Sequence, residues 1–469
     1  MNETRPLAIV ILAAGKGTRM KSRHAKVLHP LGGRALIRHV LETCRPLEAT
    51  RTVVVVGHQA SSVEAACEGY GASFALQEEQ NGTGHAVRVA RDAGLGGFEG
   101  DVVVLYGDVP LLSRASLERL LERHRAEKAA VTLLTSELDD AFGYGRIVRN
   151  DEGALTRIVE QKDASEAERA ITEWNPGIYC VRSEFLFPAL DRLRNDNAQG
   201  EFYLTDIISF AVADALPVAT ESVDAGEVAG INSRSDLAEL EGTLRQQTVA
   251  RHMDAGVTFL DPSTVWIEAD VEIGADTVIG PLVQLRGATR IGRDCRIDGN
   301  AYLIDAEVCD EVHLRPNVVL AECRIDNGAI IGPFSHLRPG AELGPEVHVG
   351  NFVEVKKATL GAGTKANHLA YIGDATIGSA TNIGAGTITC NYDGFTKHRT
   401  NIGDRVQIGS DSQLVAPVTI GDDAYVATGT TVRHDVEAGS LAYNPKPDQR
   451  RAGWVEPFRA RKRREKAGG

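Results

Sequence analysis

The repeat that decides the fold of the C-terminal half opens with Ile273-Gly274-Ala275-Asp276-Thr277-Val278-Ile279-Gly280, in which an aliphatic residue returns at the sixth position and glycine follows it. A helix would need apolar residues at i, i+3, i+4 and i+7, and a half-buried strand would need strict alternation, so a period of six satisfies neither. Hexapeptide spacing is typical of a parallel β-helix, in which short strands stack coil on coil. The repeat continues, with shifts of phase, through Leu285, Ile291, Ile297, Leu303, Val319, Ile325, Ile331, Leu337, Leu343, Val349, Val355, Leu360, Ile372, Ile377, Ile383, Ile402, Ile408, Leu414, Ile420, Val426 and Val432.

The shifts of phase each predict a bent corner or an extruded loop. Steps of five residues run from Val355 to Leu360 and from Ile372 to Ile377. A longer step contains Asn391-Tyr392-Asp393-Gly394, which is typical of a turn. Binding and catalytic residues tend to lie on loops held by a rigid scaffold, so we expect function near these breaks.

This repeat resembles that of the hexapeptide-repeat acyltransferases, whose fold is a left-handed parallel β-helix. The left-handed sense is implied by the resemblance alone, because parallel crossover connections are ordinarily right-handed. Members of that family are trimers with active sites between subunits. The resemblance therefore implies an acyltransferase domain that assembles as a homotrimer.

Length and charge indicate a globular protein with more than one domain. The chain has 469 residues, and a single hydrophobic core rarely grows beyond about 250–300 residues. Its net charge of −13 argues against general binding to nucleic acid or to a membrane surface. We expect small molecules as its partners instead.

The cysteines and the two ends of the chain indicate the cellular compartment of the protein. The seven cysteines are scattered and form no CxxC pair, which predicts reduced thiols in a cytoplasmic protein. The apolar run Leu7–Ala14 leads directly into glycines, so we expect no signal peptide, and no stretch is apolar for long enough to predict a membrane span. The basic run Arg459–Arg464 is interpreted as a solvated, frayed tail.

The N-terminal third alternates apolar runs with helix-like segments, which predicts an α/β domain with a mostly parallel, Rossmann-like sheet. In such a sheet ligands bind beyond the carboxyl ends of the strands. The predicted strands are Leu7–Leu12, Thr52–Val56, Val102–Tyr106 and Ala130–Thr135, and the predicted helices cover residues 34–44, 84–93 and 113–126.

The first predicted strand ends in the loop Leu12-Ala13-Ala14-Gly15-Lys16-Gly17-Thr18-Arg19-Met20. Its glycines let backbone N–H groups approach phosphates, and Arg19 and Lys26 add positive charge where a triphosphate would lie. The loop is neither a dinucleotide fingerprint, because Met20 stands where the third glycine belongs, nor a Walker A loop. A tight turn would explain the glycines alone, but with Arg19 and Lys26 the loop resembles the signature of sugar-1-phosphate nucleotidyltransferases.

A second motif, Tyr106-Gly107-Asp108, closes the third predicted strand. Mg²⁺ prefers hard oxygen ligands and few protein groups, so a carboxylate at a strand end beside phosphates suits it. An isolated aspartate there would more often cap a turn. The phosphate loop upstream favours the metal.

Further motifs extend the resemblance over nearly the whole chain, to the bacterial family of bifunctional N-acetylglucosamine-1-phosphate uridyltransferases and glucosamine-1-phosphate acetyltransferases. These motifs are Gln77, Gly82-Thr83-Gly84-His85, Gly143-Tyr144-Gly145-Arg146, Ile158-Val159-Glu160, Asn175 and Ile231-Asn232. The resemblance implies that Gln77, Gly82 and Thr83 contact the uracil of UTP and that Asn232 shares Mg²⁺ with Asp108. It also implies a UTP and UDP-N-acetylglucosamine site lined by Leu12, Ala13, Ala14, Gly15, Lys26, Tyr106, Gly107 and Asp108, with Gly145, Glu160 and Asn175 at the amino sugar.

A helical linker is predicted between the two halves. Ser233 followed by Asp236 marks a helix start, and Leu237 and Leu240 share one face of the helix that follows. That helix would end near Gly256. The predicted domains are therefore a uridyltransferase domain, 1–234, a helical linker, 235–255, and an acetyltransferase domain, 256–469.

His368 is the candidate base of acetyl transfer, because its ordinary pKa near neutrality suits a group that takes a proton from an amine attacking a thioester. A lone histidine would more often be a packing residue. His368, however, lies at a break in the repeat between Asn367 and Tyr371, with basic residues on neighbouring coils. Backbone N–H groups near Ala385 are candidates for stabilising the oxyanion, and we hypothesise that Glu354 orients His368.

The family resemblance implies roles for further residues of the repeat. His368 would accept the proton, Arg338 and Lys356 would contact the sugar phosphate, and Tyr371 and Asn382 would contact the sugar. The acetyl-CoA groove would be lined by Ala385, Asn391, Tyr392, Ser410 and Thr428.

One departure from the family concerns the CoA phosphates. The family often carries an arginine just past the last coil, where this chain has Tyr443-Asn444-Pro445-Lys446-Pro447. We expect Lys446, Arg450 or Arg451 to take the place of that arginine.

Together these features predict an enzyme with two active sites. The C-terminal half acetylates glucosamine-1-phosphate from acetyl-CoA, and the N-terminal half couples the product to UTP, forming UDP-N-acetylglucosamine, a precursor of the bacterial wall and outer membrane. One alternative is a sugar-1-phosphate nucleotidyltransferase whose β-helix only assembles the oligomer or binds a regulator. A zinc site made of His336, His348 and His368 is opposed by the positive charge of Arg338, and a non-enzymatic scaffold would leave the Gly15–Lys26 loop unexplained.

Overall fold

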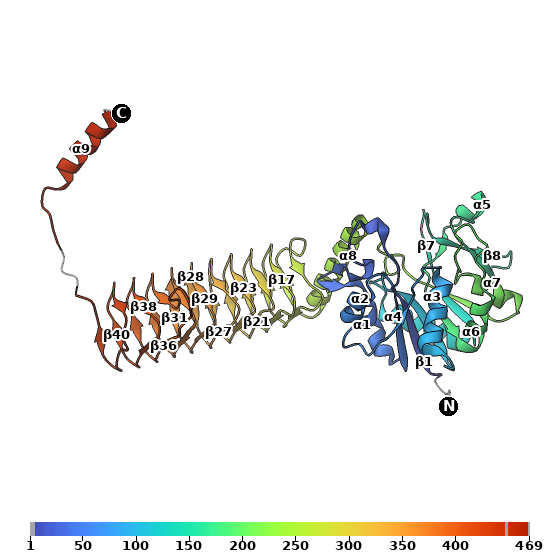
Figure 1. Ribbon diagram of the computed structural model, residues 1–469, viewed down its shortest axis with the longest axis horizontal. Coiled ribbons are helices and arrows are strands. Elements are labelled where there is room, and N and C mark those ends of the chain that lie inside the picture. The colour runs from blue at the N-terminus through green and yellow to red at the C-terminus, as the bar shows by residue number, and fades with distance from the viewer. Residues whose placement is uncertain (1–4, 446–448, 468–469) are drawn as a thin grey trace. The chain divides into compact units, whose positions relative to one another are not determined.

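The structure is a computed structural model that describes residues 5–445 and 449–467. The chain divides into two compact units, and Figure 1 shows both. The first contains Met1–Ala250 and Ile267–Asp270, and the second contains Arg251–Trp266 and Val271–Gly469. Each unit buries its own apolar core.

The first unit is built on a ten-stranded mixed sheet. Its strands are β1 Leu7–Leu12, β4 Arg51–Val56, β5 Ser73–Leu76, β6 Asp101–Tyr106, β7 Val131–Glu137, β8 Gly145–Arg149, β9 Leu155–Val159, β10 Glu173–Asn175, β11 Tyr179–Arg182 and β12 Val218–Ser222. Their order is β5-β4-β1-β6-β11-β7-β10-β8-β9, with β12 beside β7. Strands β5, β4, β1 and β6 are parallel, whereas β11 runs antiparallel to β6 and β7. The four predicted strands are confirmed as β1, β4, β6 and β7. The prediction of a mostly parallel sheet is wrong, because β8, β9, β10 and β11 add antiparallel pairings.

Helices cover both faces of this sheet, which explains why its central strands are apolar throughout instead of alternating. All six residues of β1 are buried, and Ile9 and Val10 point into two different buried clusters. Figure 1 shows the two groups of helices on either side of the sheet. They are α1 Leu36–Cys44, α2 Ala60–Ala66 and α4 Arg114–Ala126 on one face, and α3 Thr83–Ala90, α6 Ser183–Arg192 and α7 Asp206–Ala213 on the other.

Helix α8, Arg234–Asp254, follows this sheet domain along the chain. Ser233 and Asp236 cap its start reciprocally, because Asp236 N donates to Ser233 Oγ over 3.2 Å and Ser233 N donates to the Asp236 carboxylate over 3.0 Å. Leu240 on α8 is buried together with Met20. The first turns of α8 are therefore part of the core of the first unit.

The second unit is a parallel β-helix with three sheets of eleven, ten and nine short strands. Ile279 pairs with Ile297, three hexads further along the chain, and Ile297 pairs with Leu314, one residue short of three hexads. The aliphatic residue of each hexad thus stacks into a buried column, with one correction to the prediction. Leu320 and not Val319 faces the interior, because Leu320 is the residue that pairs with Leu303 and is buried, whereas Val319 is 40% exposed. The predicted six-residue repeat is confirmed as one side of a three-sided coil, and Figure 1 shows these coils stacked on one another.

The breaks in the repeat lie on a corner and on a loop, as expected. One step of five residues joins β29, Glu354–Lys356, to β30, Ala358–Leu360, and makes that coil one residue shorter than three hexads. The longer step contains the loop between β35, Ile388–Cys390, and β36, Thr400–Ile402. The first break lies one strand before β31, Lys365–His368.

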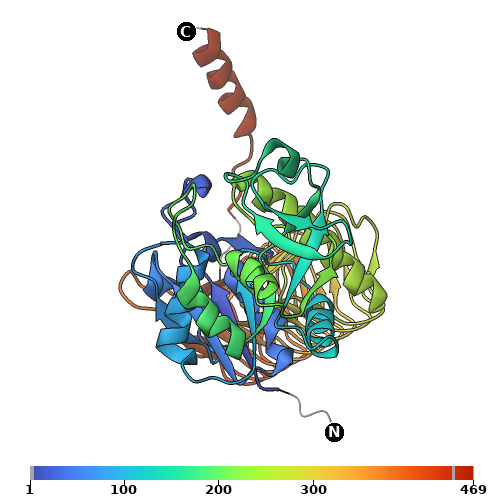
Figure 2. The ribbon, with the colours of Figure 1, turned by 90° about the vertical axis from the view of Figure 1, so that its right-hand side faces the viewer.

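The basic run near the C-terminus is helical, and Figure 2 shows it as one continuous helix. Arg459–Arg464 lies in α9, Val455–Ala467, in which no residue is buried. The prediction of a solvated segment is confirmed, but the prediction of a frayed tail is wrong. Trp454 stacks on Phe458 with ring centroids 4.6 Å apart, and such contacts between residues four apart stabilise a helix.

Two further findings bear on the environment of the protein. Among the residues that the structure describes, no helix is both long and apolar enough to span a membrane. All seven cysteines are free. Burial raises the pKa of the Cys44 thiol to about 12, so this group stays protonated near neutrality.

Candidate active sites

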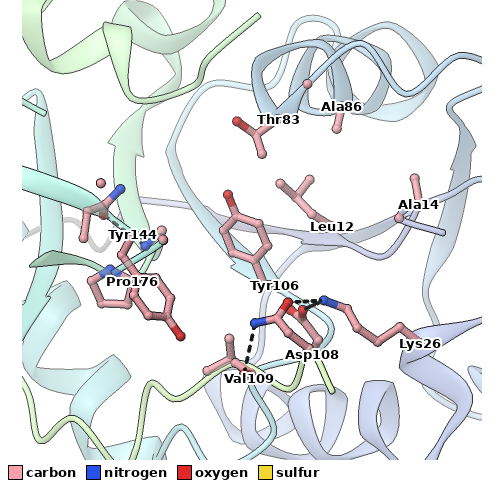
Figure 3. Close-up of a pocket in the computed structure, with 18 of the residues that line it drawn as sticks. Leu12, Ala14, Lys26, Thr83, Ala86, Tyr106, Asp108, Val109, Tyr144 and Pro176 are labelled. Carbon is pink, nitrogen blue, oxygen red and sulfur yellow. Dashed lines mark hydrogen bonds and ion pairs between the residues drawn. The ribbon is translucent and has the colours of Figure 1, made fainter. Parts of the chain in front are cut away.

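A cavity of about 620 Å³ opens beyond the carboxyl ends of β1 and β6 (Figure 3). Leu12 and Tyr106, the last residues of these strands, lie on its wall, at the edge of the sheet where the sequence predicts a ligand. Gly107 does not line it, and a Cβ at this position would lie 2.9 Å from the buried side chain of Ile37. The other predicted residues line the cavity: Leu12, Ala13, Ala14, Gly15, Arg19, Lys26, Gln77, Gly82, Thr83, Tyr106, Asp108, Gly145, Glu160, Asn175 and Asn232.

Two cationic side chains and two oxygen-bearing side chains meet at one end of this cavity. The ammonium group of Lys26 forms an ion pair with the carboxylate of Asp108, which Figure 3 shows. The same ammonium group donates a hydrogen bond to Asn232 Oδ1 over 3.2 Å, and the guanidinium group of Arg19 donates to that oxygen over 2.8 Å. The predicted phosphate and metal residues are therefore brought together in space.

The oxygen atoms of Asp108 and Asn232 suit a magnesium ion. Mg²⁺ is usually held by one or two protein groups together with substrate phosphates and water. The ammonium group of Lys26 contacts both oxygen atoms, which shows that a cation is accommodated there. Within residues 5–445 and 449–467, no group of three or more His, Cys, Asp or Glu side chains is arranged to hold a metal.

Another wall of the cavity carries the residues predicted for the amino sugar. Burial raises the pKa of the Glu160 carboxyl group, and Thr205 Oγ1 donates a hydrogen bond to it over 3.2 Å. Asn175 Nδ2 donates to the Tyr179 hydroxyl over 2.6 Å, while Gly177 N donates to Asn175 Oδ1 over 3.0 Å. These two contacts fix the orientation of the Asn175 amide beside the cavity.

Gln77 and Gly82 lie together at the start of α3. Gln77 is buried, and its Nε2 donates to the carbonyl oxygen of Gly82 over 3.2 Å. Gly82 has a φ of 102°, and a Cβ there would lie 2.6 Å from the carbonyl oxygen of Phe202, so only glycine fits. Thr83 then begins α3 and lines the cavity, which places the amino end of a helix at the predicted uracil position.

Several residues of the cavity were given no role in the site by sequence reasoning, although Tyr144 stands in a quoted motif. The ring of Tyr144 packs against Trp174 with centroids 4.1 Å apart and reaches the cavity. Asp236 accepts a hydrogen bond from Asn232 N over 2.8 Å and so holds the residue that meets the cations. The sequence marks Asp236 only as a helix cap, and the hydroxyl groups that hold the amino-sugar residues have no motif of their own.

In the second unit, His368 lies in a column of residues along one corner of the β-helix. It is the last residue of β31, Lys365–His368, and it pairs with Asn351 at the end of β28, His348–Asn351. The following coils continue in the same register. Three of the predicted acetyl-CoA residues therefore follow His368 along this corner, one on each coil: Ala385, Ser410 and Thr428.

The side chain of His368 contacts Asn351, since its Nδ1 lies 3.1 Å from Asn351 Oδ1. Glu354 instead accepts a hydrogen bond from Arg338 over 2.6 Å and pairs in register with Tyr371. The hypothesis that Glu354 orients His368 is therefore wrong. The register places Glu354 on another side of the coil, where its carboxylate forms an ion pair with Arg338.

Lys356 lies in a cluster of positive charges that includes one residue absent from the prediction. The ammonium group of Lys397 lies beside that of Lys356 and lowers its pKa, and Arg338 and Lys357 add to the effect. Lys397 belongs to the loop between β35 and β36, so only the folded loop brings it here. Like charges gathered in this way favour the binding of an anion.

Tyr371 is held in place by its neighbours on the coil. A Cβ at Gly373 would lie 2.5 Å from the Tyr371 hydroxyl, so the absence of a side chain there makes room for the ring. Asn391 Nδ2 lies 3.5 Å from the same hydroxyl and donates to Asp374 over 2.6 Å. Asn391 is buried, whereas Tyr392 is exposed on the loop. The side chain of Asn391 therefore contacts the hydroxyl group of Tyr371 in this structure.

The remaining predicted contacts are distributed over two faces of the coil. Asn382 lies on β34, Asn382–Ile383, in the eleven-stranded sheet, whereas Tyr371 lies on β32, Tyr371–Gly373, in the ten-stranded sheet. His368 lies at the corner between these two sheets. Lys446, predicted for the CoA phosphates, lies outside the described residues.

Two protein families match parts of this chain. The MobA-like NTP transferase domain matches residues 9–208, which include most of the sheet that carries the cavity. The bacterial transferase hexapeptide family (six repeats) matches residues 322–357 and 399–434, which belong to the β-helix.

The chain is also similar over almost its whole length to bacterial proteins named "Bifunctional protein GlmU". The relative from Trichlorobacter lovleyi is 51% identical over 452 residues, which cover 95% of this chain and 97% of the relative. The relative from Anaeromyxobacter dehalogenans is 50% identical over 467 residues (98% and 95%), and the relative from Koribacter versatilis is 44% identical over 471 residues (99% and 100%). A solved structure of a UDP-glucose pyrophosphorylase complexed with UDP-glucose is 18% identical, covers 52% of this chain and 99% of its own, and has a TM-score of 0.43.

Proposed function

The chain belongs to the family of bifunctional GlmU proteins, and from this premise we propose how its two units divide the synthesis of UDP-N-acetylglucosamine. It is a bifunctional transferase, with a nucleotidyltransferase domain followed by a left-handed β-helix of hexapeptide repeats that acts as an acetyltransferase. In our assignment residues 1–234 transfer the uridylyl group, residues 235–255 form the connecting helix, and residues 256–469 transfer the acetyl group. The observation that carries the assignment is that one chain holds both a cationic nucleotide cavity and a histidine column on a β-helix.

In the first unit, UTP would place its phosphates at Arg19 and Lys26 and its uracil at Gln77 and Gly82. The phosphate oxygen of N-acetylglucosamine-1-phosphate attacks the α-phosphorus, the bond to the bridging oxygen breaks, and pyrophosphate leaves. Such transfers depend on alignment and on neutralisation of charge, which Arg19 and Lys26 supply. The amino sugar would lie against Gly145, Glu160 and Asn175.

Asp108 and Asn232 would hold Mg²⁺ at the phosphate end of the cavity. A bound ion would neutralise charge on the phosphate oxygens. Lys26, which pairs with Asp108 in this structure, would then pair with a phosphate oxygen.

In the second unit, the amine of glucosamine-1-phosphate attacks the thioester carbon of acetyl-CoA. A C–N bond forms, the C–S bond breaks, and His368 takes the proton of the amine. Arg338 and Lys356 bind the sugar phosphate, and Tyr371 and Asn382 contact the sugar. Acetyl-CoA lies along Ala385, Asn391, Tyr392, Ser410 and Thr428, and its phosphates are assigned to Lys446, Arg450 or Arg451.

Hexapeptide-repeat domains typically assemble into oligomers, and we assign a homotrimer to this chain. Phe334, Phe352 and Leu369 form an apolar ridge beside His368, with exposed fractions of 50%, 57% and 62%, and the rings of Phe334 and Phe352 stack with centroids 5.5 Å apart. Such a row of exposed apolar side chains favours contact with another protein surface. A second subunit at the ridge would bring a second set of sugar contacts to His368. Sedimentation equilibrium measures the state, and a monomer with full acetyl transfer would contradict the assignment.

We place the enzyme in the cytoplasm. A reducing compartment keeps free cysteines as thiols, and all seven are free here. Cell fractionation tests this, and recovery in an oxidising compartment would contradict it.

The experiment that tests the whole proposal uses two readouts on one preparation. Thiol release is followed with acetyl-CoA and glucosamine-1-phosphate, and pyrophosphate release is followed with UTP and N-acetylglucosamine-1-phosphate. We expect both. Pyrophosphate without thiol release would mean that the β-helix only assembles the oligomer or binds a regulator.

Replacement of Lys397 by alanine is expected to raise the KM for glucosamine-1-phosphate about tenfold, because a hydrogen bond to a charged group is worth about 1.5–3 kcal/mol. The value of kcat should change little, since no bond to the phosphate forms or breaks in acetyl transfer and its contact is made equally in the ground and transition states. Steady-state thiol release measures both parameters. Pyrophosphate release by the same sample is the control, and an unchanged KM would remove Lys397 from the phosphate site.

A further inference from the structure

Asn351 holds the side chain of His368 through a contact that is built into the coil. The two residues pair in register on β28 and β31, and Asn351 Oδ1 lies 3.1 Å from His368 Nδ1. The parallel backbone pairing fixes both Cα positions, so the contact does not depend on a mobile loop. We propose that Asn351 is a positioning residue that selects the tautomer of His368 required for acetyl transfer. This inference rests on the proposed function of His368.

The chemistry of the two groups determines which tautomer is selected. In a neutral imidazole one ring nitrogen carries the proton and the other carries a lone pair. The oxygen of an amide can only accept a hydrogen bond. When Asn351 Oδ1 lies beside Nδ1, the proton is held on Nδ1 and the lone pair is left on Nε2. Nε2 is then the atom that can receive the proton of the substrate amine.

The same contact is compatible with every step of the transfer. The amine nitrogen bonds to the thioester carbon, the proton of the amine passes to His368 Nε2, and the C–S bond breaks with its electron pair going to sulfur. The imidazolium still donates its Nδ1 hydrogen to Asn351, so no partner is lost when the ring gains a charge. The proton on Nε2 then passes to the departing thiolate, which leaves as the thiol of CoA.

A neutral amide fixes the ring without adding a negative charge beside it. A carboxylate in the place of Asn351 would stabilise the imidazolium and so make His368 a base that is protonated up to a higher pH. The carboxylate of Glu354 is held by Arg338 over 2.6 Å and does not take this role. The titratable and polar groups on the strands around His368 are His348 on β28, Lys365 on β31, Glu354 and Lys356 on β29, Tyr371 on β32 and the uncharged Asn382 on β34.

Replacement of Asn351 by alanine is expected to lower the kcat of acetyl transfer by about tenfold to a hundredfold. General base catalysis contributes about 10²–10⁴-fold in rate, and part of this is lost when the ring can adopt either tautomer and rotate. The KM for glucosamine-1-phosphate should stay within about twofold, because Asn351 is not assigned a contact with the sugar phosphate. Pyrophosphate release by the same sample should be unchanged.

Replacement of Asn351 by aspartate separates positioning from a merely structural role. The side chain keeps its size and its oxygen beside Nδ1, but it adds a negative charge. We expect the acid limb of the kcat/KM profile for acetyl transfer to move up by about one pH unit or more, with activity recovered at higher pH. Loss of packing alone would lower the whole profile without moving this limb. Because aspartate is nearly isosteric, this variant also keeps the test decisive should the alanine variant fold poorly.

Asn327 provides a matched control at another corner of the β-helix. Its Oδ1 accepts a hydrogen bond from Asp310 N over 3.1 Å, so Asn327→Ala also removes one contact between coils, and acetyl transfer should stay at the wild-type level. A wild-type kcat in Asn351→Ala, or an unmoved acid limb in Asn351→Asp, would overturn the inference while His368→Ala remained inactive. Full acetyl transfer by His368→Ala would instead overturn the proposed function of His368 itself.

Discussion

Replacement of His368 by alanine lowers acetyl transfer by an expected factor of about 10²–10⁴, which is the usual contribution of general acid–base catalysis. His368 is the ring that stands at the corner where the candidate sugar and acetyl-CoA contacts meet. Without its imidazole, the proposed acceptor for the proton of the attacking amine is lost. Thiol release from acetyl-CoA in the presence of glucosamine-1-phosphate measures the loss.

The same samples carry their own control. Pyrophosphate release from UTP and N-acetylglucosamine-1-phosphate should be unchanged in His368→Ala, because that reaction belongs to the other unit. His434→Ala removes another exposed imidazole of the β-helix and should leave both activities intact. Equal thiol release by His368→Ala and wild type would mean that His368 is a packing residue and not the base. It would favour a β-helix that only assembles the oligomer.

Replacement of Lys26 by alanine is expected to lower pyrophosphate release by about 10²–10³-fold, the usual cost of losing one group that stabilises developing charge. Its ammonium group lies between Asp108 and Asn232 in this structure. In the reaction it would compensate the phosphate charges, which Arg19 alone cannot balance. Steady-state pyrophosphate release measures the effect, and acetyl transfer by the same sample should be unaffected.

A second variant, at Asp108, and a control variant at a surface lysine accompany this test. Asp108→Asn should also depress turnover strongly and should raise the Mg²⁺ concentration needed for half-maximal rate, because an amide is a weaker ligand than a carboxylate for a hard cation. Lys162→Ala removes an exposed lysine that does not line the cavity and should leave pyrophosphate release intact. Wild-type turnover in Lys26→Ala would remove the phosphate role of that residue, and an unchanged Mg²⁺ requirement in Asp108→Asn would remove the metal assignment.

Much of the architecture could be predicted because each domain has a recognisable pattern of apolar residues in its sequence. The aliphatic residue of most hexads faces inward, so Ile279, Ile297 and Leu314 stack in one column, although Leu320 takes the inward place predicted for Val319. In the first unit the buried runs that end at Leu12 and Tyr106 mark parallel strands, and parallel strands bring their carboxyl ends to one edge. The antiparallel strands β8 to β11 were not predicted, since they are short and lack a distinctive period.

The residues of the site were predicted more completely in the first unit than in the second. Most residues quoted as motifs in the first unit lie together around one cavity, because their motifs lie at an end of a strand or at the start of a helix. In the second unit the loop that carries Lys397 had to fold before its ammonium group could meet Lys356. Thr205 and Tyr179, which hold Glu160 and Asn175, have no recognisable pattern because a single hydrogen bond needs no repeated residue.

The sequence by itself determined which side chains face the core, since a period of six or a continuous apolar run records burial residue by residue. Only the tertiary structure decided which polar side chains touch. The shortened coil pairs His368 with Asn351 and Tyr371 with Glu354, so the amide and not the carboxylate reaches the imidazole. The physical reason is that burial is a property of one residue and its period, whereas a hydrogen bond depends on the register between two coils, and one residue fewer at a corner changes every partner beyond it.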